Sequence, residues 1–174
     1  MEIFYDILKI TLPALLVMLT TWLVIKQMLR DDQDRRRQDL LLQTVKTITP
    51  IKLQAYERIV LFLERISTES LIMRTGKPEM TAQQLHSAMI ANIRNEYEHN
   101  LSQQIYMSNE AWEMVKNAKG TVVRIINKIA TQLPPTATGE ELSRLLIEEM
   151  MDMDAEPCRA ALNYVKAELA RYMM

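Results

Sequence analysis

The chain has 174 residues, with 3 Gly, 6 Pro, 13 Met and a single cysteine, Cys158. Few turn-forming residues among many straight-chain helix formers favour an all-α fold, and one cysteine excludes an intramolecular disulfide. The net charge of −1 and the pI near 6.2 provide no basic field that would attract nucleic acid, so we expect no nucleic-acid partner.

Residues 7–29 form an apolar segment that predicts a membrane-spanning helix. Sixteen uncharged residues separate Lys9 from Lys26, and the 23 residues of the segment reach roughly 34 Å as a helix, more than a hydrocarbon core of about 30 Å. Glu2 and Asp6 precede the segment and no small-residue cleavage site follows it, so we do not expect a cleaved signal peptide. A buried helix of a soluble protein is the other interpretation. The side chains expected inside the bilayer are Leu12, Leu15, Leu16, Leu19, Trp22 and Leu23.

Positive charge gathers on the C-terminal side of this segment. The positive-inside rule therefore predicts that the short N-terminus lies outside and that the rest of the chain is cytoplasmic, with membrane lipid as a direct partner of the segment. The residues expected at the membrane–water interface are Lys9, Lys26, Arg30, Arg35, Arg36 and Arg37.

The sequence divides into three parts: a short N-terminus and membrane helix (1–29), a stalk (30–48) and a helical bundle (49–174). Residues 30–48 alternate in charge and contain no Gly or Pro, so we expect the membrane helix to continue through them. Thr49 and Pro50 are typical of a new helix start, a capping side chain followed by a proline in the first turn. The remaining chain predicts a cytoplasmic bundle of about five helices with short, antiparallel connections.

Capping motifs and breaks mark the helices within residues 49–174. Thr81 with Gln84, and Thr138 with Glu141, have the spacing of a capping box, in which side-chain and backbone groups satisfy one another at a helix start. Ser108 is a single capping side chain of the same kind. The helices expected from these signals span residues 50–66, 67–73, 82–106 and 109–133, with two more beginning at 139 and near 157.

Apolar residues recur every three or four positions in these helices, which predicts the faces that form the core. The face on residues 109–133 is interpreted as core or as a contact face for a partner helix. The predicted core positions are Ile51, Leu53, Ala55, Ile59, Val60, Phe62, Leu63 and Ile66 on the first helix, Leu85, Met89, Ile93, Tyr97, Leu101 and Ile105 on the third, and Val115, Ala118, Val122, Ile125 and Ile129 on the fourth.

Catalytic and metal-binding motifs are few. Glu96 and His99 have the Glu-x-x-His spacing found in di-iron helical bundles, but those sites need a second such motif, and the other histidine, His86, has Gln83 at the carboxylate position. We therefore expect no metal and no cofactor. An enzyme with an unrecognised site would need a pocket that gathers Arg94, Glu96, Glu98 and His99.

Two aromatic residues are candidate contacts for a partner protein. Trp112 lies at the start of the predicted fourth helix and Tyr106 lies just before it. Aromatic residues of this kind anchor protein interfaces, but packing in the core is the other interpretation of both.

Residues 50–66 and 98–112 carry a resemblance to a family. The stretches Pro50–Arg58 with Phe62–Ile66, and Glu98–Tyr106 with Glu110–Trp112, resemble those of an uncharacterised family of bacterial single-pass inner-membrane proteins with a cytoplasmic all-helical domain. The resemblance implies a bacterial inner-membrane location and carries no activity.

An anchor joined to a domain without catalytic motifs favours a non-enzymatic adaptor or accessory subunit of a membrane protein complex. The alternative is a structural protein that assembles into a homo-oligomer at the membrane. An enzyme with an unrecognised site is the third hypothesis.

Overall fold

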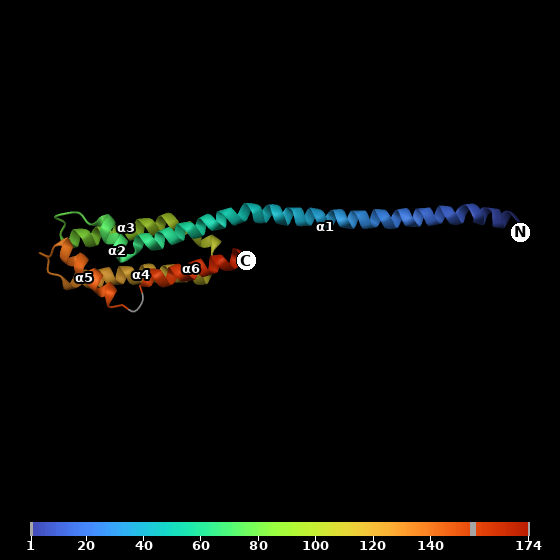
Figure 1. The fold of residues 1–174 in the computed structure, drawn as a ribbon. Coiled ribbons are helices and arrows are strands. Elements are labelled where there is room, and N and C mark those ends of the chain that lie inside the picture. The colour runs from blue at the N-terminus through green and yellow to red at the C-terminus, as the bar shows by residue number, and fades with distance from the viewer. Residues whose placement is uncertain (1, 154–155, 174) are drawn as a thin grey trace. The chain divides into compact units, whose positions relative to one another are not determined.

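The chain is all-α over the residues that the computed structural model describes, 2–153 and 156–173, with the side chains of residues 2–14, 31–35, 37–41 and 44 excepted. This confirms the predicted fold class. In chain order the elements are α1 (Glu2–Ile66), α2 (Thr68–Thr75), α3 (Ala82–Asn100), the 3-10 helix η1 (Leu101–Tyr106), α4 (Asn109–Gln132), α5 (Gly139–Met151) and α6 (Pro157–Met173), as drawn in Figure 1.

The chain forms two compact units, residues 1–49 and 50–174, and α1 contributes to both. The prediction that a new helix begins at Pro50 is wrong. A proline inside a helix removes one backbone hydrogen bond, here the one that residue 50 would donate to the carbonyl of Lys46, while the turns on both sides consist mainly of residues that tolerate a helix. The helix therefore continues through Pro50 with its backbone ladder one bond short.

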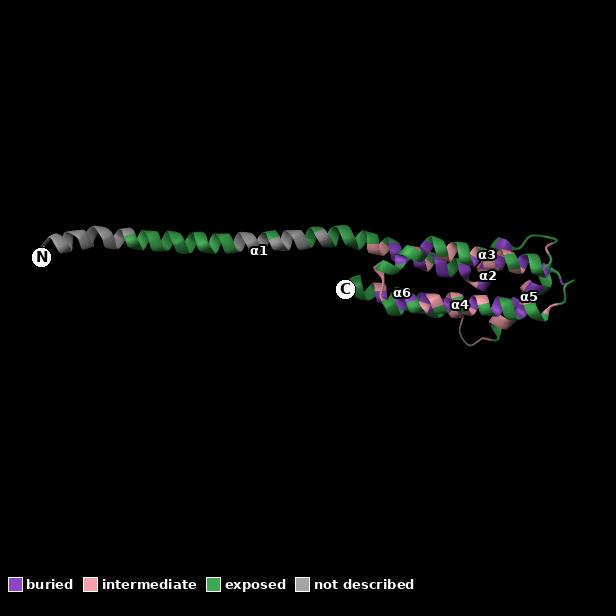
Figure 2. Cartoon of the chain, turned by 180° about the vertical axis from the view of Figure 1, so that it is seen from behind, coloured by how far each residue is buried: buried purple, intermediate pink, exposed green. Residues whose placement is uncertain are grey.

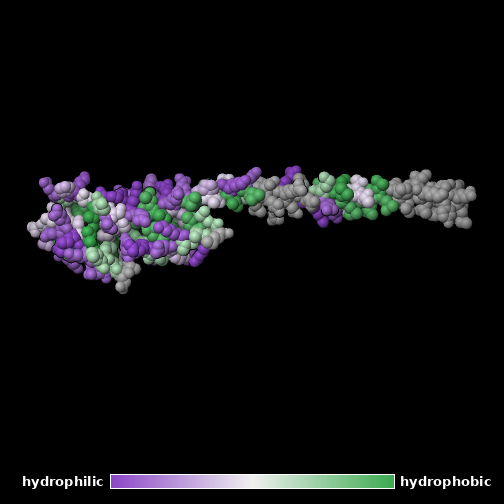
Figure 3. All heavy atoms as spheres, viewed as in Figure 1, coloured by the Kyte–Doolittle hydropathy of each residue, from purple (hydrophilic) through white to green (hydrophobic). Residues whose placement is uncertain are grey.

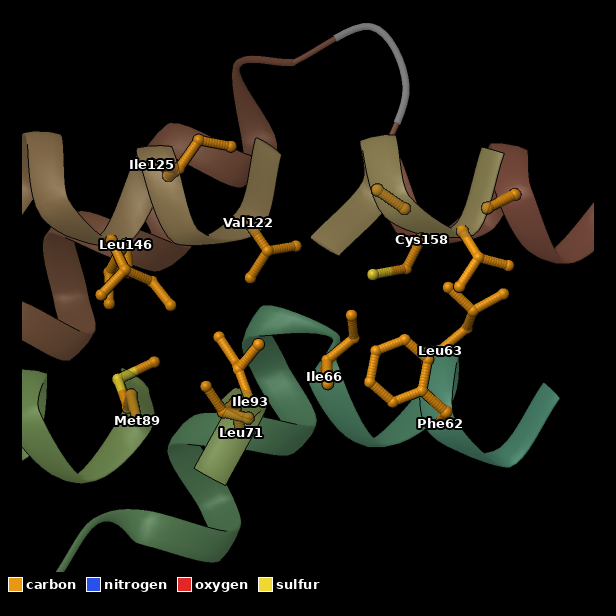
Figure 4. Close-up of a cluster of buried hydrophobic side chains, with 14 of the residues drawn as sticks. Phe62, Leu63, Ile66, Leu71, Met89, Ile93, Val122, Ile125, Leu146 and Cys158 are labelled. Carbon is orange, nitrogen blue, oxygen red and sulfur yellow. The ribbon is translucent and has the colours of Figure 1, made fainter. Parts of the chain in front are cut away.

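The second unit is a bundle of two helical layers. Residues 50–66 of α1 lie with α2 and α3 in one layer, and α4, α5 and α6 form the other (Figure 1). Apolar side chains fill the space between the layers: Phe62, Leu63 and Ile66 point toward it from α1, and Val122 and Cys158 point toward it from α4 and α6 (Figure 4). Burial is concentrated along these inner faces (Figure 2).

The helical period predicts most of this core. All five predicted positions on α4, from Val115 to Ile129, are buried, which assigns this face to the core of the bundle. On α1 the buried stripe runs from Ala55 to Ile66, while Ile51, another predicted core position, is 43% exposed.

The prediction that one α-helix runs to Tyr106 is wrong beyond Asn100. The buried Asn100 side chain donates from Nδ2 to the carbonyl of Glu96 at 2.8 Å and accepts from Arg58 Nε at 3.2 Å. An asparagine that bonds to the preceding turn competes with the α-helical ladder, and the following six residues adopt the tighter 3-10 form. The change of period turns Leu101 and Ile105 outward, to 41% and 73% exposure.

The starts of α3 and α5 are paired with each other. Both predicted capping boxes are confirmed, and Ser108 caps α4 by accepting a hydrogen bond from Ala111 N. Between the two boxed starts, Ala82 N donates to the carbonyl of Ala137 at 2.9 Å, and Gly139 N donates to the carbonyl of Met80 at 2.7 Å. Gly139 permits this approach, because a Cβ there would lie 3.0 Å from the oxygen of Met80.

Two glycines that lie in helices should respond oppositely to alanine. A Cβ added to Gly120, in the middle of α4, would meet no atom within 4 Å, so Gly120→Ala should raise the free energy of unfolding by about 0.5–1 kcal/mol. Gly139→Ala should lower it by about 1 kcal/mol, because the carbonyl of Met80 cannot move without lengthening its own hydrogen bond. Urea unfolding measures the change in the free energy of unfolding for each variant. Equal changes in the two variants would contradict the close approach at Gly139.

Candidate functional site

The described part of α1 before residue 50 carries apolar side chains that no other part of the described chain covers. Figure 2 draws this stretch as exposed, and Figure 3 shows apolar residues dominating its surface between residues 15 and 30. Lys26 Nζ lies 4.7 Å from the ring centroid of Trp22, a cation–π contact on the surface of the helix. The eleven exposed residues are Leu15, Leu16, Val17, Met18, Leu19, Trp22, Leu23, Val24, Ile25, Met28 and Leu29.

A membrane-spanning helix is not supported by the described residues, among which no helix is both long and apolar enough to cross a bilayer. The predicted segment 7–29 falls partly outside them. The side chains of Lys9, Leu12, Arg35 and Arg37 lie in the undescribed stretches. Insertion of this segment therefore stays a prediction.

Trp112, one of the two predicted partner contacts, is placed in the core. It is only 7% exposed and its ring stacks on that of Tyr97, with centroids 5.7 Å apart. Lys119 Nζ lies over the ring of Tyr97, 3.6 Å from its centroid. The second candidate, Tyr106, is half-buried at the end of η1. The packing of Trp112 thus favours a role in stability, and a role of Tyr106 in partner contact stays a prediction.

Glu96 is engaged in an ion-pair cluster that joins three helices. Arg65 of α1 donates to its carboxylate at 3.0 and 3.3 Å, and Arg74 of α2 donates to it at 3.1 Å. A pocket of about 120 Å³ opens beside the cluster, lined in part by Arg58 and His99. The carboxylate accepts charge-assisted hydrogen bonds from both guanidinium groups, so it holds α1 and α2 against α3 as a structural clamp.

The enzyme hypothesis requires Arg94, Glu96, Glu98 and His99 in one pocket, and the structure brings only Glu96 and His99 to this one. Glu98 and Arg94 lie exposed on α3. Within the described part of the chain, no three His, Cys, Asp or Glu residues gather in a way that could hold a metal ion.

The site that the sequence analysis missed is the buried carboxylate of Glu168 on α6. Tyr56 Oη of α1 and Ser108 Oγ donate short hydrogen bonds to its two oxygens, and Ser108 N donates at 3.1 Å. The Ser108 hydroxyl also accepts from Ala111 N, so one group caps α4 and binds Glu168. The signal was present: Glu168 falls in the helical stripe formed by Ala161 and Val165.

The network sets the ionisation of its members. Burial by itself raises the pKa of Glu168, but the hydrogen bonds from Ser108 and Tyr56, together with the charge of Lys52, hold this pKa below its ordinary value. Burial, and then the bond to the Glu168 carboxylate, raise the pKa of the Tyr56 phenol. Glu168 is therefore an ionised acceptor and Tyr56 a neutral donor, which is the protonation that their hydrogen bonds require.

These features define a class of protein, an all-α chain in which a long N-terminal helix leads into a two-layered helical bundle. Its family is shown by comparison: a family of unknown function, DUF7935, matches residues 2–172, and the chain belongs to it. No curated protein and no solved structure matches the chain significantly.

Glu168→Gln should destabilise the bundle and flatten its response to acid. The amide cannot accept from all three donors, so the free energy of unfolding should fall by about 1–3 kcal/mol at pH 7. Because the folded pKa of Glu168 is depressed, its contribution is present above the ordinary value of about 4.3 and is lost as the pH falls through the folded pKa.

Urea unfolding at pH 7, 5, 4 and 3 tests this prediction. The wild type should lose more stability than Glu168→Gln below about pH 4. Glu113→Gln is the matched control, since Glu113 is exposed and forms a surface ion pair with Lys116 within α4. Parallel pH profiles for wild type and Glu168→Gln would show that folding does not lower the pKa of Glu168.

Proposed function

We propose that this protein is a non-enzymatic adaptor or accessory subunit of a membrane protein complex, held in the bacterial inner membrane by residues 7–29. In this proposal the N-terminus lies outside and residues 50–174 offer a helical surface to another protein in the cytoplasm. The observation that supports the proposal is the set of eleven exposed apolar side chains between Leu15 and Leu29 on α1.

The energetics favour lipid as the cover for these side chains. Each Leu, Ile or Val contributes about −0.3 to −0.6 kcal/mol on an insertion scale, which gives roughly −3 to −5 kcal/mol for the nine such residues of the central stretch. The positive flank that includes Lys26, Arg30 and Arg36 orients the segment with its C-terminal side in the cytoplasm. Membership of a family without an assigned function leaves the adaptor role to be tested directly.

A second candidate function, self-assembly into a structural homo-oligomer, is favoured by a separate observation. Leu42, Val45 and Ile48 are all exposed and recur every three residues along α1. Residues spaced in this way share one side of a helix, where a second copy could cover them.

Membrane anchoring can be tested by placing charge in the middle of the segment. Leu19→Arg with Leu23→Arg adds about 5–7 kcal/mol to the cost of insertion, more than the gain from the apolar residues. The double variant should move from the membrane pellet to the supernatant, whereas wild type should stay in the pellet after a carbonate wash. Leu42→Arg, outside the segment, should behave as wild type. Wild-type protein in the supernatant would refute the anchor.

The oligomer candidate is separated from the adaptor by mass. If copies pair through the exposed stripe, the protein in mild detergent should have the mass of a multimer, and Val45→Glu should reduce it to that of a monomer, since it places like charges in contact. A monomeric wild type that co-purifies with a second protein supports the adaptor.

A further inference from the structure

A groove runs along the surface of the bundle where α2 meets the end of α5 and the start of α6. One half is a hollow of about 480 Å³, and an adjoining hollow of about 430 Å³ forms the other half. The two hollows share Glu69, Glu156 and Arg159 in their walls, so they lie side by side, and we call the pair the groove. The volume of the first is within the range of pockets that enclose a ligand or several side chains.

The first half, which we call the methionine end, has apolar side chains on one part of its wall and Thr68, Glu69, Glu156 and Arg159 on the rest. Its walls include Ile147, Met150, Met151 and Met153, and Met151 is 80% exposed. Methionine side chains are unbranched and polarizable, so they adjust their shape to different apolar partners. Surfaces rich in exposed methionine are used to hold amphipathic helices of varied sequence.

The second half, which we call the acidic end, has three carboxylates in its wall, those of Glu64, Glu69 and Glu156, against the two cations of Arg159 and Lys166. In the described part of the chain, no cation lies within ion-pair distance of the Glu64 or Glu69 carboxylates. Glu156 has Arg159 at 3.8 Å, and Lys166 lies elsewhere in the same wall.

Cys158, at the start of α6, is one of the residues that line the acidic end. Burial raises its pKa to about 12, with smaller contributions from Glu156 and Glu64. The thiol is therefore protonated at pH 7 and adds no charge to the acidic end.

We infer that this groove binds an amphipathic helix of a partner protein, with bulky apolar side chains in the methionine end and a Lys or Arg against Glu64 and Glu69. The inference rests on the proposed adaptor function and names its partner by chemistry. A fatty acid suits the groove less well, because the three carboxylates in its walls outnumber the two cations, Arg159 and Lys166, that could receive the acid. A helix with lysines on its flank supplies both the apolar surface and the missing counter-charge.

The test uses the full chain in nanodiscs of neutral phosphatidylcholine, with the methionine methyl groups labelled with carbon-13. The probes are two synthetic 14-residue helices with the same leucine face, one with lysine and one with glutamate on the other face. The lysine helix should shift the methyl signals of Met150, Met151 and Met153. Met73, which is 79% exposed on α2 outside the groove, should not shift.

Two pairs of variants separate charge from apolar contact. Glu64→Gln with Glu69→Gln should weaken binding of the lysine helix about tenfold and reduce its dependence on salt. Glu98→Gln, which removes an exposed carboxylate on α3, should leave the affinity and its dependence on salt unchanged. Met151→Asp should also weaken binding about tenfold, and Met73→Asp is its control, since both residues are equally exposed and neither substitution disturbs the core.

Several outcomes would overturn the inference. Equal shifts with the glutamate helix would show that charge plays no part. Shifts at Met73 as large as those in the groove would show non-specific contact, and shifts on concentrating the chain without a helix would assign the groove to a second copy. Broadening of the groove methyls by a paramagnetic lipid would assign it to lipid. Failure of the anchor appears in the carbonate wash instead, and the titration can then be repeated without nanodiscs.

Discussion

The packing of the last three turns of α1 against the helices around it is the interaction on which the bundle depends. Tyr56, Ile59, Phe62, Leu63 and Ile66 are almost fully buried, and each large apolar side chain removed from water contributes about 1.5–3 kcal/mol. The same helix supplies Tyr56 to the Glu168 network and Arg65 to the Glu96 clamp. Apolar contact, which has no preferred direction, holds α1 against the bundle. The hydrogen bonds to Glu168 on α6 and to Glu96 on α3 then fix the rotation of α1 and its position along its own axis.

The Glu168 network has a cost as well as a gain. A buried carboxylate must replace the hydrogen bonds to water that it loses. Here two hydroxyl groups and one backbone amide supply the replacements. One donor comes from Tyr56 on α1 and the other two from Ser108 at the start of α4, while the acceptor lies on α6, so the bonds are satisfied only when α1, α4 and α6 are all in register. An apolar residue at position 168 could fill the space but could not discriminate between registers in this way.

The parts of the fold that sequence could predict are those decided by local spacing. The stripe from Val115 to Ile129 and the capping boxes at Thr81 and Thr138 depend on residues within one or two turns, and each is present in the structure. The predictions of helix bounds that failed are those in which a distant contact, or a defect that the helix tolerates, determines the local structure. Pro50 is a helix-start signal that the helix accommodates, and α3 ends at Asn100, whose buried side chain bonds both to the preceding turn and to Arg58, 42 positions earlier.

The candidate sites follow the same division. Residues 15–29 stand out in the sequence because their apolar character is contiguous, whereas the groove is assembled from residues of 64–69, 147–153 and 156–166, which only the fold brings together. Trp112 shows the limit of a composition argument, since an aromatic residue at a helix start suits an interface and a core equally well, and the stacking on Tyr97 decides for the core.

The membrane surface and the groove would compete for the same kind of helix. A helix with an apolar face and a basic flank is attracted to the anionic inner leaflet of a membrane by the same forces that we assign to the groove, burial of apolar side chains and attraction between opposite charges. In the proposed function the bundle is tethered close to that leaflet and would meet such a helix at high local concentration, so modest affinity in the groove would be enough to capture it. Salt weakens both forms of binding through the charges, whereas the methionine end offers what a flat lipid surface does not, a bounded apolar hollow that selects for the shape of the partner's side chains.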